Sequence, residues 1–197
     1  MLTRKPPARS SEPALSDQEL VEHASPTMAG LKTGSLFLCR YEDRGEFIGE
    51  VRDYNRRFAG KGVSIVPLYM REDRALVYAF RMTHLTADLQ KEDARKILSE
   101  DGYDCSDAGK CIRRLAEQFE TGDSFPHEVG LFLSYPPEDV AGFIRNHAAN
   151  CKYTGLWKVY GDVDSAKRTF AKYRKCTACY SRFLEKNGCI EKLLVAD

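Results

Sequence analysis

The longest regular pattern in this chain is a stripe of apolar and aromatic residues between positions 163 and 184. Its members follow one another at alternating steps of three and four residues, which is the spacing of one face of an α-helix. The stripe consists of Val163, Ala166, Phe170, Tyr173, Thr177, Tyr180 and Leu184. It predicts one long helix over residues 163–186, and a helix of this kind buries its apolar face against the rest of the fold.

Short aromatic or β-branched runs alternate with helical patterns along the rest of the chain. The runs that predict strands are 35–41, 63–69, 74–80, 127–135 and 153–161. The helical segments are 17–24, a second short helix that begins at Ser25 and Pro26, 46–62, 84–120 and 137–148. The charged turn MREDR predicts a hairpin, and Pro67 places its first strand at an edge or bulge. This order predicts an α/β fold: a single-domain sandwich with a mixed sheet of about five strands covered by helices.

The length of 197 residues is enough for one well-buried core, so we expect a single domain. Residues 1–14 are rich in Pro, Ser, Arg and Lys and lack periodicity, which predicts a disordered tail before a domain at 15–197. No run approaches the roughly 20 apolar residues of a spanning helix, and the N-terminus has charges and prolines where a signal peptide is apolar. These features predict a cytoplasmic protein.

The charge balance argues against two classes of partner. The chain has 30 Lys and Arg residues against 29 Asp and Glu residues, a formal net charge of +1. Such a balance gives no general field for nucleic acid or an acidic membrane, and we expect the protein to bind neither. Trp157 lies in the aromatic run GLWKVYG, whose rings could stack on bases, but the charge and the predicted helical cover favour a core position for it.

Cys176 and Cys179 form a CxxC motif, whose spacing suits a redox pair or half of a zinc site. A zinc site needs a second pair of ligands at comparable spacing, and the sequence has none. A thioredoxin-like motif opens a helix after a strand, whereas this one lies inside the predicted helix 163–186. Metal ligation with Cys151 or Cys189 stays geometrically possible, but packing and surface thiols are the preferred interpretation, and we expect no structural zinc. The seven cysteines lack the pairing of a secreted scaffold, which predicts reduced thiols.

The segment SFPHEVGLFLSYPPEDV places His127 and Glu128 between Pro126 and an apolar run. A histidine beside a carboxylate at the start of a strand or helix can serve as an acid/base pair, a metal ligand or an anchor for a ligand. The pair can equally be structural, with Glu128 capping a terminus and His127 hydrogen-bonded to the backbone. The sequence lacks a phosphate-binding loop, a dinucleotide fingerprint, a nucleophile elbow and an HExxH motif, so no reaction is assigned.

Five segments together resemble the family called domain of unknown function 3793. They are PTMAGLK (26–32), LVYAFR (76–81), FPHEVGLFLSYPPEDVAGFI (125–144), GLWKVYGD (155–162) and FAKYRKC (170–176). The resemblance covers roughly residues 15–195, and the family's Pro-His-Glu motif matches residues 126–128. It implies a protein of anaerobic Gram-positive bacteria, a functional role for His127, and no known activity. Cys176 matches the family pattern, whereas the family has Gly at the position of Ser134, where a side chain would narrow a pocket mouth.

The first functional hypothesis is a domain that binds a small molecule or cofactor where His127 and Glu128 meet the segment 26–32. Thr27 and Lys32 would supply a hydroxyl and a positive charge, and aromatic side chains would form a wall. The wall residues are Tyr135, Trp157 and Tyr160. The second hypothesis is an adaptor without turnover that docks on a redox or metal-handling protein, and a large apolar patch without a concave pocket would favour it. The third is an acid/base enzyme that uses His127 and Glu128.

Overall fold

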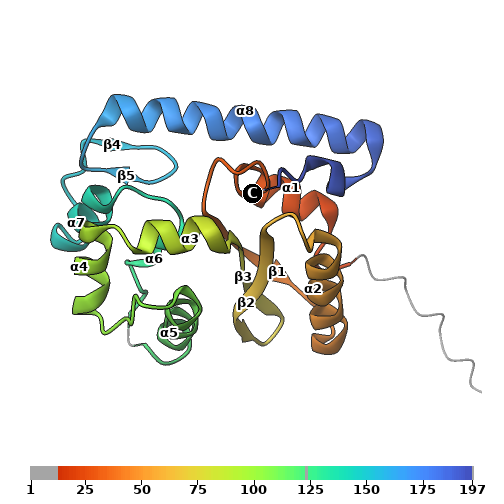
Figure 1. Cartoon of the computed structure of the whole chain (residues 1–197), viewed down its shortest axis with the longest axis horizontal. Helices are drawn as coiled ribbons and strands as arrows, with labels where there is room; N and C mark the ends of the chain where they lie inside the picture. The colour runs from red at the N-terminus through yellow and green to blue at the C-terminus, as the bar shows by residue number, and fades with distance from the viewer. Residues whose placement is uncertain (1–12, 123, 197) are drawn as a thin grey trace, which may run out of the picture.

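The computed structural model describes residues 13–122 and 124–196, in which helices alternate with short strands (Figure 1). The strands are β1 (Gly34–Arg40), β2 (Val63–Arg71), β3 (Arg74–Arg81), β4 (Tyr153–Thr154) and β5 (Lys158–Val159). The helices are α1 (Asp17–Met28), α2 (Arg44–Phe58), α3 (Met82–Leu89), α4 (Glu92–Glu100), α5 (Ala108–Thr121), α6 (Val129–Phe132), α7 (Pro137–Arg145), α8 (Val163–Asn187) and the 3₁₀ turn η1 (Ile190–Leu193). The fold is therefore mixed α/β, as the sequence predicts.

The main sheet has three antiparallel strands in the order β1–β3–β2, and β4 pairs with β5 in a separate hairpin. β2 and β3 form the predicted hairpin, with β2 on an edge of the sheet. The register of β2 against β3 shifts between Pro67 and Tyr69, because proline has no N–H for the ladder and is tolerated at an edge or bulge. The expectation of one mixed sheet of about five strands is wrong in detail, since the described residues form two small antiparallel sheets.

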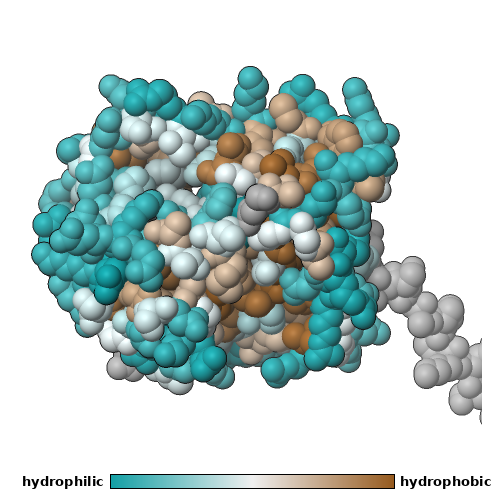
Figure 2. All heavy atoms as spheres, in the orientation of Figure 1, coloured by the Kyte–Doolittle hydropathy of each residue, from teal (hydrophilic) through white to brown (hydrophobic). Residues whose placement is uncertain are grey.

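Helices cover both faces of the three-stranded sheet (Figure 1). One face packs with α1, α2 and the C-terminal segment in a core that includes Phe47 and Ile190. The other face packs with α3 to α7 in a second core that includes Leu115 and Phe132. Figure 2 shows the outcome on one side of the molecule: hydrophilic side chains cover the outer helices, and hydrophobic ones gather near the middle. Within the described residues, no helix is both long and apolar enough to cross a bilayer.

α8 is the predicted long helix, and it extends from Val163 to Asn187. The side chain of Asp162 caps its first turn, and the helix ends at Gly188, whose φ of 59° suits glycine. In Figure 1, α8 lies across one side of the molecule, alongside α1 and the β4–β5 hairpin. Its Phe170 packs edge-on against Trp157 of the hairpin, with ring centroids 4.4 Å apart. The apolar stripe of α8 therefore anchors the hairpin to the rest of the fold.

Arg81, at the end of β3, is fully buried and ties separate parts of the chain together. Its guanidinium donates hydrogen bonds to the carbonyl oxygens of Thr27 and Met28, both at 2.6 Å, in the last turn of α1. It also donates to the carbonyl oxygens of Lys61 at 3.2 Å and Val195 at 2.6 Å. Carbonyl groups at the end of a helix lack donors within the helix, and Arg81 adds a donor to two of them. The N–H groups of Gly30 and Val195 also bond to these carbonyls, so the end of α1 is held from several sides.

Two of the predicted strands, 127–135 and 153–161, do not form as single strands in the structure. Residues 127–135 contain the helical turn α6, not a strand, and every residue from Val129 to Leu133 is buried. A short apolar run of this kind fits a buried helical turn as well as a buried strand, so periodicity alone does not separate the two. In the run 153–161 only the two-residue strands β4 and β5 pair. The chain turns between them at Gly155, where an added Cβ would lie 2.1 Å from the Phe170 ring.

The predicted restart of the helix at Pro26 is also wrong, because α1 continues through this residue to Met28. Proline removes one N–H group from the ladder. The chain remains helical because the N–H of Ala29 bonds to the carbonyl of Ser25 at 2.9 Å, and the N–H of Leu31 bonds to the carbonyl of Pro26 at 2.8 Å.

The expected tail, residues 1–14, lies outside the described residues except for Pro13 and Ala14. The N–H of Ala14 donates to Glu50 at 3.3 Å, and the thiol of Cys39 donates to the carbonyl of Ala14 at 2.6 Å. Ala14 is therefore held against α2 and β1.

Candidate functional site

The Pro-His-Glu motif lies directly before α6, and its two titratable side chains face different surroundings. Glu128 is only 6% exposed, and its Oε1 accepts a 2.7 Å hydrogen bond from the hydroxyl of Tyr103. Burial and this hydrogen bond raise the pKa of Tyr103 well above its usual range, so Tyr103 remains a donor. Glu128 is therefore a partner of Tyr103 in the core and not of the neighbouring imidazole.

His127, in contrast, is exposed. Its ring meets the ring of Phe143 edge-on, with centroids 4.9 Å apart, and lies 5.7 Å from the ring of Phe125. Within the described residues the imidazole of His127 has no hydrogen bond to Glu128 or to the backbone. The structure therefore does not bring His127 and Glu128 together as an acid/base pair, and neither capping nor core packing accounts for the imidazole.

His127 stands at one side of a hollow of about 360 Å³ between α6, α7 and the β4–β5 hairpin, which we call the aromatic cleft. Its ring-bearing and apolar walls are Phe125, His127, Tyr135, Phe143, Leu156 and Trp157. Tyr135 and Trp157 stack with centroids 4.6 Å apart at an interplanar angle of 25°. Two of the three wall residues that the sequence proposed, Tyr135 and Trp157, thus lie together beside His127.

Asp139 holds the tryptophan wall in position. This carboxylate lies in the first turn of α7 and is 3% exposed. Its Oδ2 accepts a 2.7 Å hydrogen bond from the indole N–H of Trp157, and its Oδ1 accepts from the N–H groups of Tyr160 at 2.7 Å and Gly161 at 2.8 Å. Sequence reasoning missed this role, because an acid early in a helix is already explained by the helix dipole. The carboxylate fixes the hairpin to α7 and makes the cleft a preformed surface.

Two other proposed ligand-binding residues lie outside the aromatic cleft. Thr27 is fully buried, and its Oγ1 lies 2.9 Å from the hydroxyl of Ser35, so its hydroxyl is used inside the fold. The hydroxyl of Tyr160 donates to the carbonyl of Ala149 at 2.9 Å, and its ring packs on Gly142, where an added Cβ would lie 2.4 Å from the ring. Both residues serve packing.

Lys32 lines a second hollow, of about 380 Å³, which we call the Lys32 hollow. Its polar walls come from Lys32, Thr33, His84, Asp88, Lys91 and Ser134. The Lys32 amine lies 5.7 Å from the centroid of the Tyr135 ring, and burial lowers the pKa of this amine to about 8. Tyr135 lines both hollows and therefore forms the partition between them.

The backbone conformation at Ser134 explains why the family resemblance implies glycine at this position. Its φ of 60° lies in the left-handed region, which glycine adopts without strain. The serine hydroxyl accepts a 2.6 Å hydrogen bond from the N–H of Thr33, which supports this backbone conformation. Ser134 lines the Lys32 hollow and not the aromatic cleft.

The CxxC cysteines lie on α8, away from both hollows. Cys176 is buried and Cys179 is exposed, and both thiols are free. Burial raises the pKa of Cys176 to about 11, which disfavours the thiolate that metal binding and redox chemistry require. Across residues 13–122 and 124–196, no group of three or more His, Cys, Asp or Glu side chains is placed to hold a metal ion.

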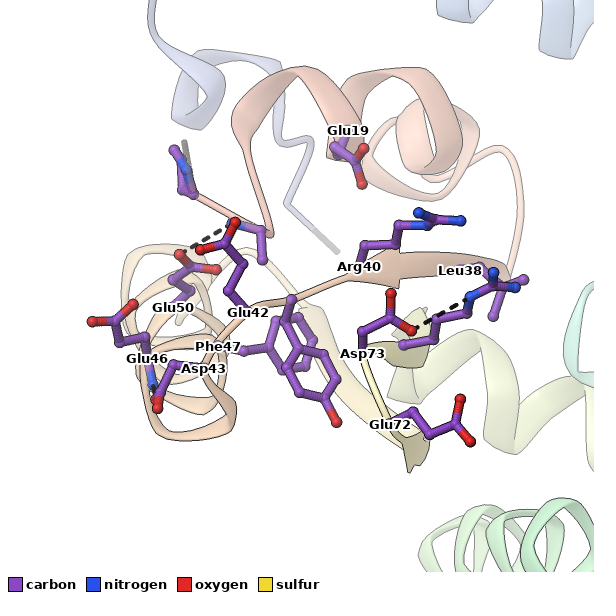
Figure 3. A pocket seen from close by; sticks show the side chains of 14 residues that line it. Glu19, Leu38, Arg40, Glu42, Asp43, Glu46, Phe47, Glu50, Glu72 and Asp73 are labelled. Carbon is purple, nitrogen blue, oxygen red and sulfur yellow. Dashed lines mark hydrogen bonds and ion pairs between the residues drawn. The ribbon is translucent and has the colours of Figure 1, made fainter. Parts of the chain in front are cut away.

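A larger hollow, of about 1100 Å³, lies between α1, α2 and the β2–β3 turn and is rich in carboxylates (Figure 3). Several of these carboxylates already have structural partners. Asp43 caps α2 by accepting a 2.8 Å hydrogen bond from the N–H of Glu46, and Glu50 accepts one of 2.9 Å from the N–H of Leu15. The hollow is therefore a weaker candidate than the aromatic cleft, whose histidine has no structural role.

Comparison with known proteins supports the resemblance described above. A family model described as Protein of unknown function (DUF3793) matches residues 20–194, a span that includes the aromatic cleft and the Lys32 hollow. No curated protein and no solved structure matches the chain. Because the match covers most of its length, the chain belongs to the DUF3793 family of proteins of unknown function.

Proposed function

We propose that this protein binds a small molecule that places a planar or apolar group in the aromatic cleft, with His127 at the rim. The observation that supports this most strongly is the environment of His127: an exposed imidazole held between the rings of Phe125 and Phe143. A histidine with no internal hydrogen bond, beside a concave surface, is available to a ligand as donor, acceptor or cation.

The size and chemistry of the cleft fit such a ligand. Its volume of about 360 Å³ falls within the range of ligand pockets, which starts near ~300 Å³. The stacked pair Tyr135 and Trp157 presents flat apolar surface, and offset stacking on such rings favours planar groups. Asp139 holds the indole in place, so little conformational entropy is lost when a ligand binds.

An adaptor role is the second candidate, and the rim of the cleft supports it. Phe125 and Leu156 are 56% and 45% exposed, so a partner protein could insert an apolar side chain between them. The concave cleft favours the small molecule over a flat docking surface. An acid/base enzyme has less support, because Glu128 is hydrogen-bonded to Tyr103 and does not reach the cleft.

Trp157 is the only tryptophan of the chain, and it lines the cleft, so its fluorescence reports on binding. We would titrate the protein with a panel of one- and two-ring aromatic compounds in neutral, cationic and anionic forms. At least one compound should quench the fluorescence of Trp157 in a saturable way. Phe125→Ala removes one wall of the cleft and should weaken the binding of that compound about 3- to 10-fold, which corresponds to the loss of one aromatic contact.

Leu38→Ala is the matched control, because Leu38 is a large apolar residue, 61% exposed, that does not line the cleft. It should leave the affinity unchanged. A panel without a single saturable quencher, or equal losses in the two variants, would refute the proposal.

A further inference from the structure

We propose that the Lys32 hollow is an anion site that takes the carboxylate or phosphate group of a small molecule. This inference goes beyond the aromatic cleft, since it rests on residues on the other side of Tyr135 and does not require the cleft to be occupied.

The charge balance of the hollow is the first argument. Two lysines, Lys32 and Lys91, line it, against one carboxylate, Asp88, among the lining residues that the structure describes. Asp88 is already engaged: its Oδ1 accepts a 2.6 Å hydrogen bond from Lys91, and its Oδ2 accepts one from the hydroxyl of Thr33. Lys32 forms no salt bridge within the described residues, so its charge is left for a ligand.

The position of Lys32 is fixed, which is the second argument. The N–H of the next residue, Thr33, is bonded to Ser134, and the N–H of Leu31 is bonded to the carbonyl of Pro26. The loop between α1 and β1 is thus tied on both sides of Lys32. A lysine whose backbone is held in this way loses less freedom when an anion binds than one on a loose loop.

Desolvation of the Lys32 amine also favours an anion in the hollow. Lys32 is partly exposed, and burial of its amine lowers the pKa of this group to about 8, so the folded protein partly desolvates this cation without a salt-bridge partner. An anion in the hollow would supply the missing charge in a site of low dielectric, where a charge-assisted hydrogen bond is strong.

The walls of the hollow add a favourable field. They include the N-terminal turn of α4, at Lys91 and Ala94, and this helix has no side-chain cap at that end. Uncapped N-terminal turns have unpaired N–H groups and a partial positive charge. The volume of about 380 Å³ exceeds what a single anionic group needs, which points to a small molecule that bears one.

The test uses the full chain with inorganic phosphate and, separately, succinate as probes, at constant ionic strength. Backbone amide NMR signals of residues 30–33 and of Ser134 should shift saturably. Lys32→Met, which keeps most of the stem but removes the charge, should weaken this binding at least about tenfold. Lys96→Met, which alters an exposed lysine of α4 outside the hollow, should not change it.

The two probes separate the ligand classes: a Lys32-dependent response to phosphate alone, to succinate alone or to both supports the site and identifies the group it takes. Lys32→Met should also raise the melting temperature of the free protein, because an unpaired and partly desolvated charge is removed. Shifts that do not saturate, or that persist equally in both variants, would overturn the inference. A lower melting temperature for Lys32→Met would overturn it as well, by showing that the amine serves the fold.

Discussion

The hydroxyl of Tyr103 donates a 2.7 Å hydrogen bond to Oε1 of Glu128, and both groups are buried. This bond joins the loop after α4 to the Pro-His-Glu motif and turns Glu128 into the core. The neighbouring His127 is left at the surface, against Phe143. The motif is therefore divided: the carboxylate lies in the core, and the imidazole lies at the surface.

Tyr103→Phe tests the structural half of the motif. Removal of the hydroxyl leaves a buried carboxylate oxygen without its donor, so the free energy of unfolding should fall by about 1–3 kcal/mol. Tyr153→Phe is the control, because the hydroxyl of Tyr153 has no hydrogen bond within the described residues, and it should change stability by less than about 0.5 kcal/mol. Urea unfolding measures both. Equal stability of the two variants would show that the Tyr103–Glu128 bond contributes nothing.

Arg81→Met should destabilise the fold strongly. It replaces a fully buried guanidinium and removes its hydrogen bonds to four main-chain carbonyl groups, which link the end of α1 to Lys61 and Val195. We expect a loss of about 3 kcal/mol or more in urea unfolding. Arg40→Met, at an exposed position of β1, should be nearly neutral. A loss of less than about 1 kcal/mol for Arg81→Met would contradict the structural role given to this guanidinium.

Asp139→Asn tests the support of the cleft wall. An amide keeps one acceptor but replaces the other with a donor, which then faces an N–H group. Stability should fall by about 1–3 kcal/mol, and the Trp157 emission should shift to longer wavelength as the indole loses its partner. Glu138→Gln, at the exposed preceding residue, is the control. An unchanged emission spectrum for Asp139→Asn would show that the carboxylate does not hold the indole.

Alkaline pH should destabilise the protein through its buried thiols. Burial raises the pKa of Cys39 from 9.0 to about 12 and that of Cys176 from 9.0 to about 11. Because the folded-state pKa values are the higher ones, this stabilisation is complete below pH 9 and is lost as the pH rises through 11 and 12. Urea unfolding between pH 7 and pH 11 should therefore show a decline above pH 9.

In the same experiment, deprotonation of Lys32 should raise the free energy of unfolding as the pH rises, opposite to the effect of the thiols. Its pKa in the folded state is lowered from 10.5 to about 8, so its unfavourable contribution is complete below pH 8 and disappears as the pH rises to 10.5. Lys32→Met should therefore show a steeper alkaline decline than the unchanged protein. A shallower decline in this variant would show that the Lys32 amine is not desolvated.

Helical periodicity predicts most of the fold, because apolar spacing over many residues admits one interpretation. The stripe that ends at Leu184 corresponds to α8, and the segment 84–120 to α3, α4 and α5. The run 127–135 fails as a strand because its central residues, from Val129 to Leu133, are all buried, so that neither a period of two nor one of 3.6 stands out. Local pattern also does not show that β4 and β5 form their own hairpin.

The candidate site was partly predictable for a related reason. Residues adjacent in sequence need not share a surface. Tyr103, whose hydroxyl holds Glu128 in the core while His127 stays exposed, comes from a distant segment with no motif. Tyr135 and Trp157 of the predicted aromatic wall lie in the cleft, whereas Tyr160 lies outside it. The role of Asp139 was not predicted, since its partners are set by the tertiary fold. Lys32 was identified by its charge alone, and its desolvation follows only from packing.

The most direct test of the account compares His127→Gln with His147→Gln, which alters an exposed histidine outside the cleft. Each variant would be titrated by Trp157 fluorescence with the compound that binds the unchanged protein best, and unfolded in urea. We predict that both keep the free energy of unfolding to within about 0.5 kcal/mol, and that only His127→Gln loses affinity, by about 5-fold or more. Full affinity in His127→Gln, or a loss of about 1–3 kcal/mol of stability, would contradict the claim that His127 is a binding residue and not a structural one.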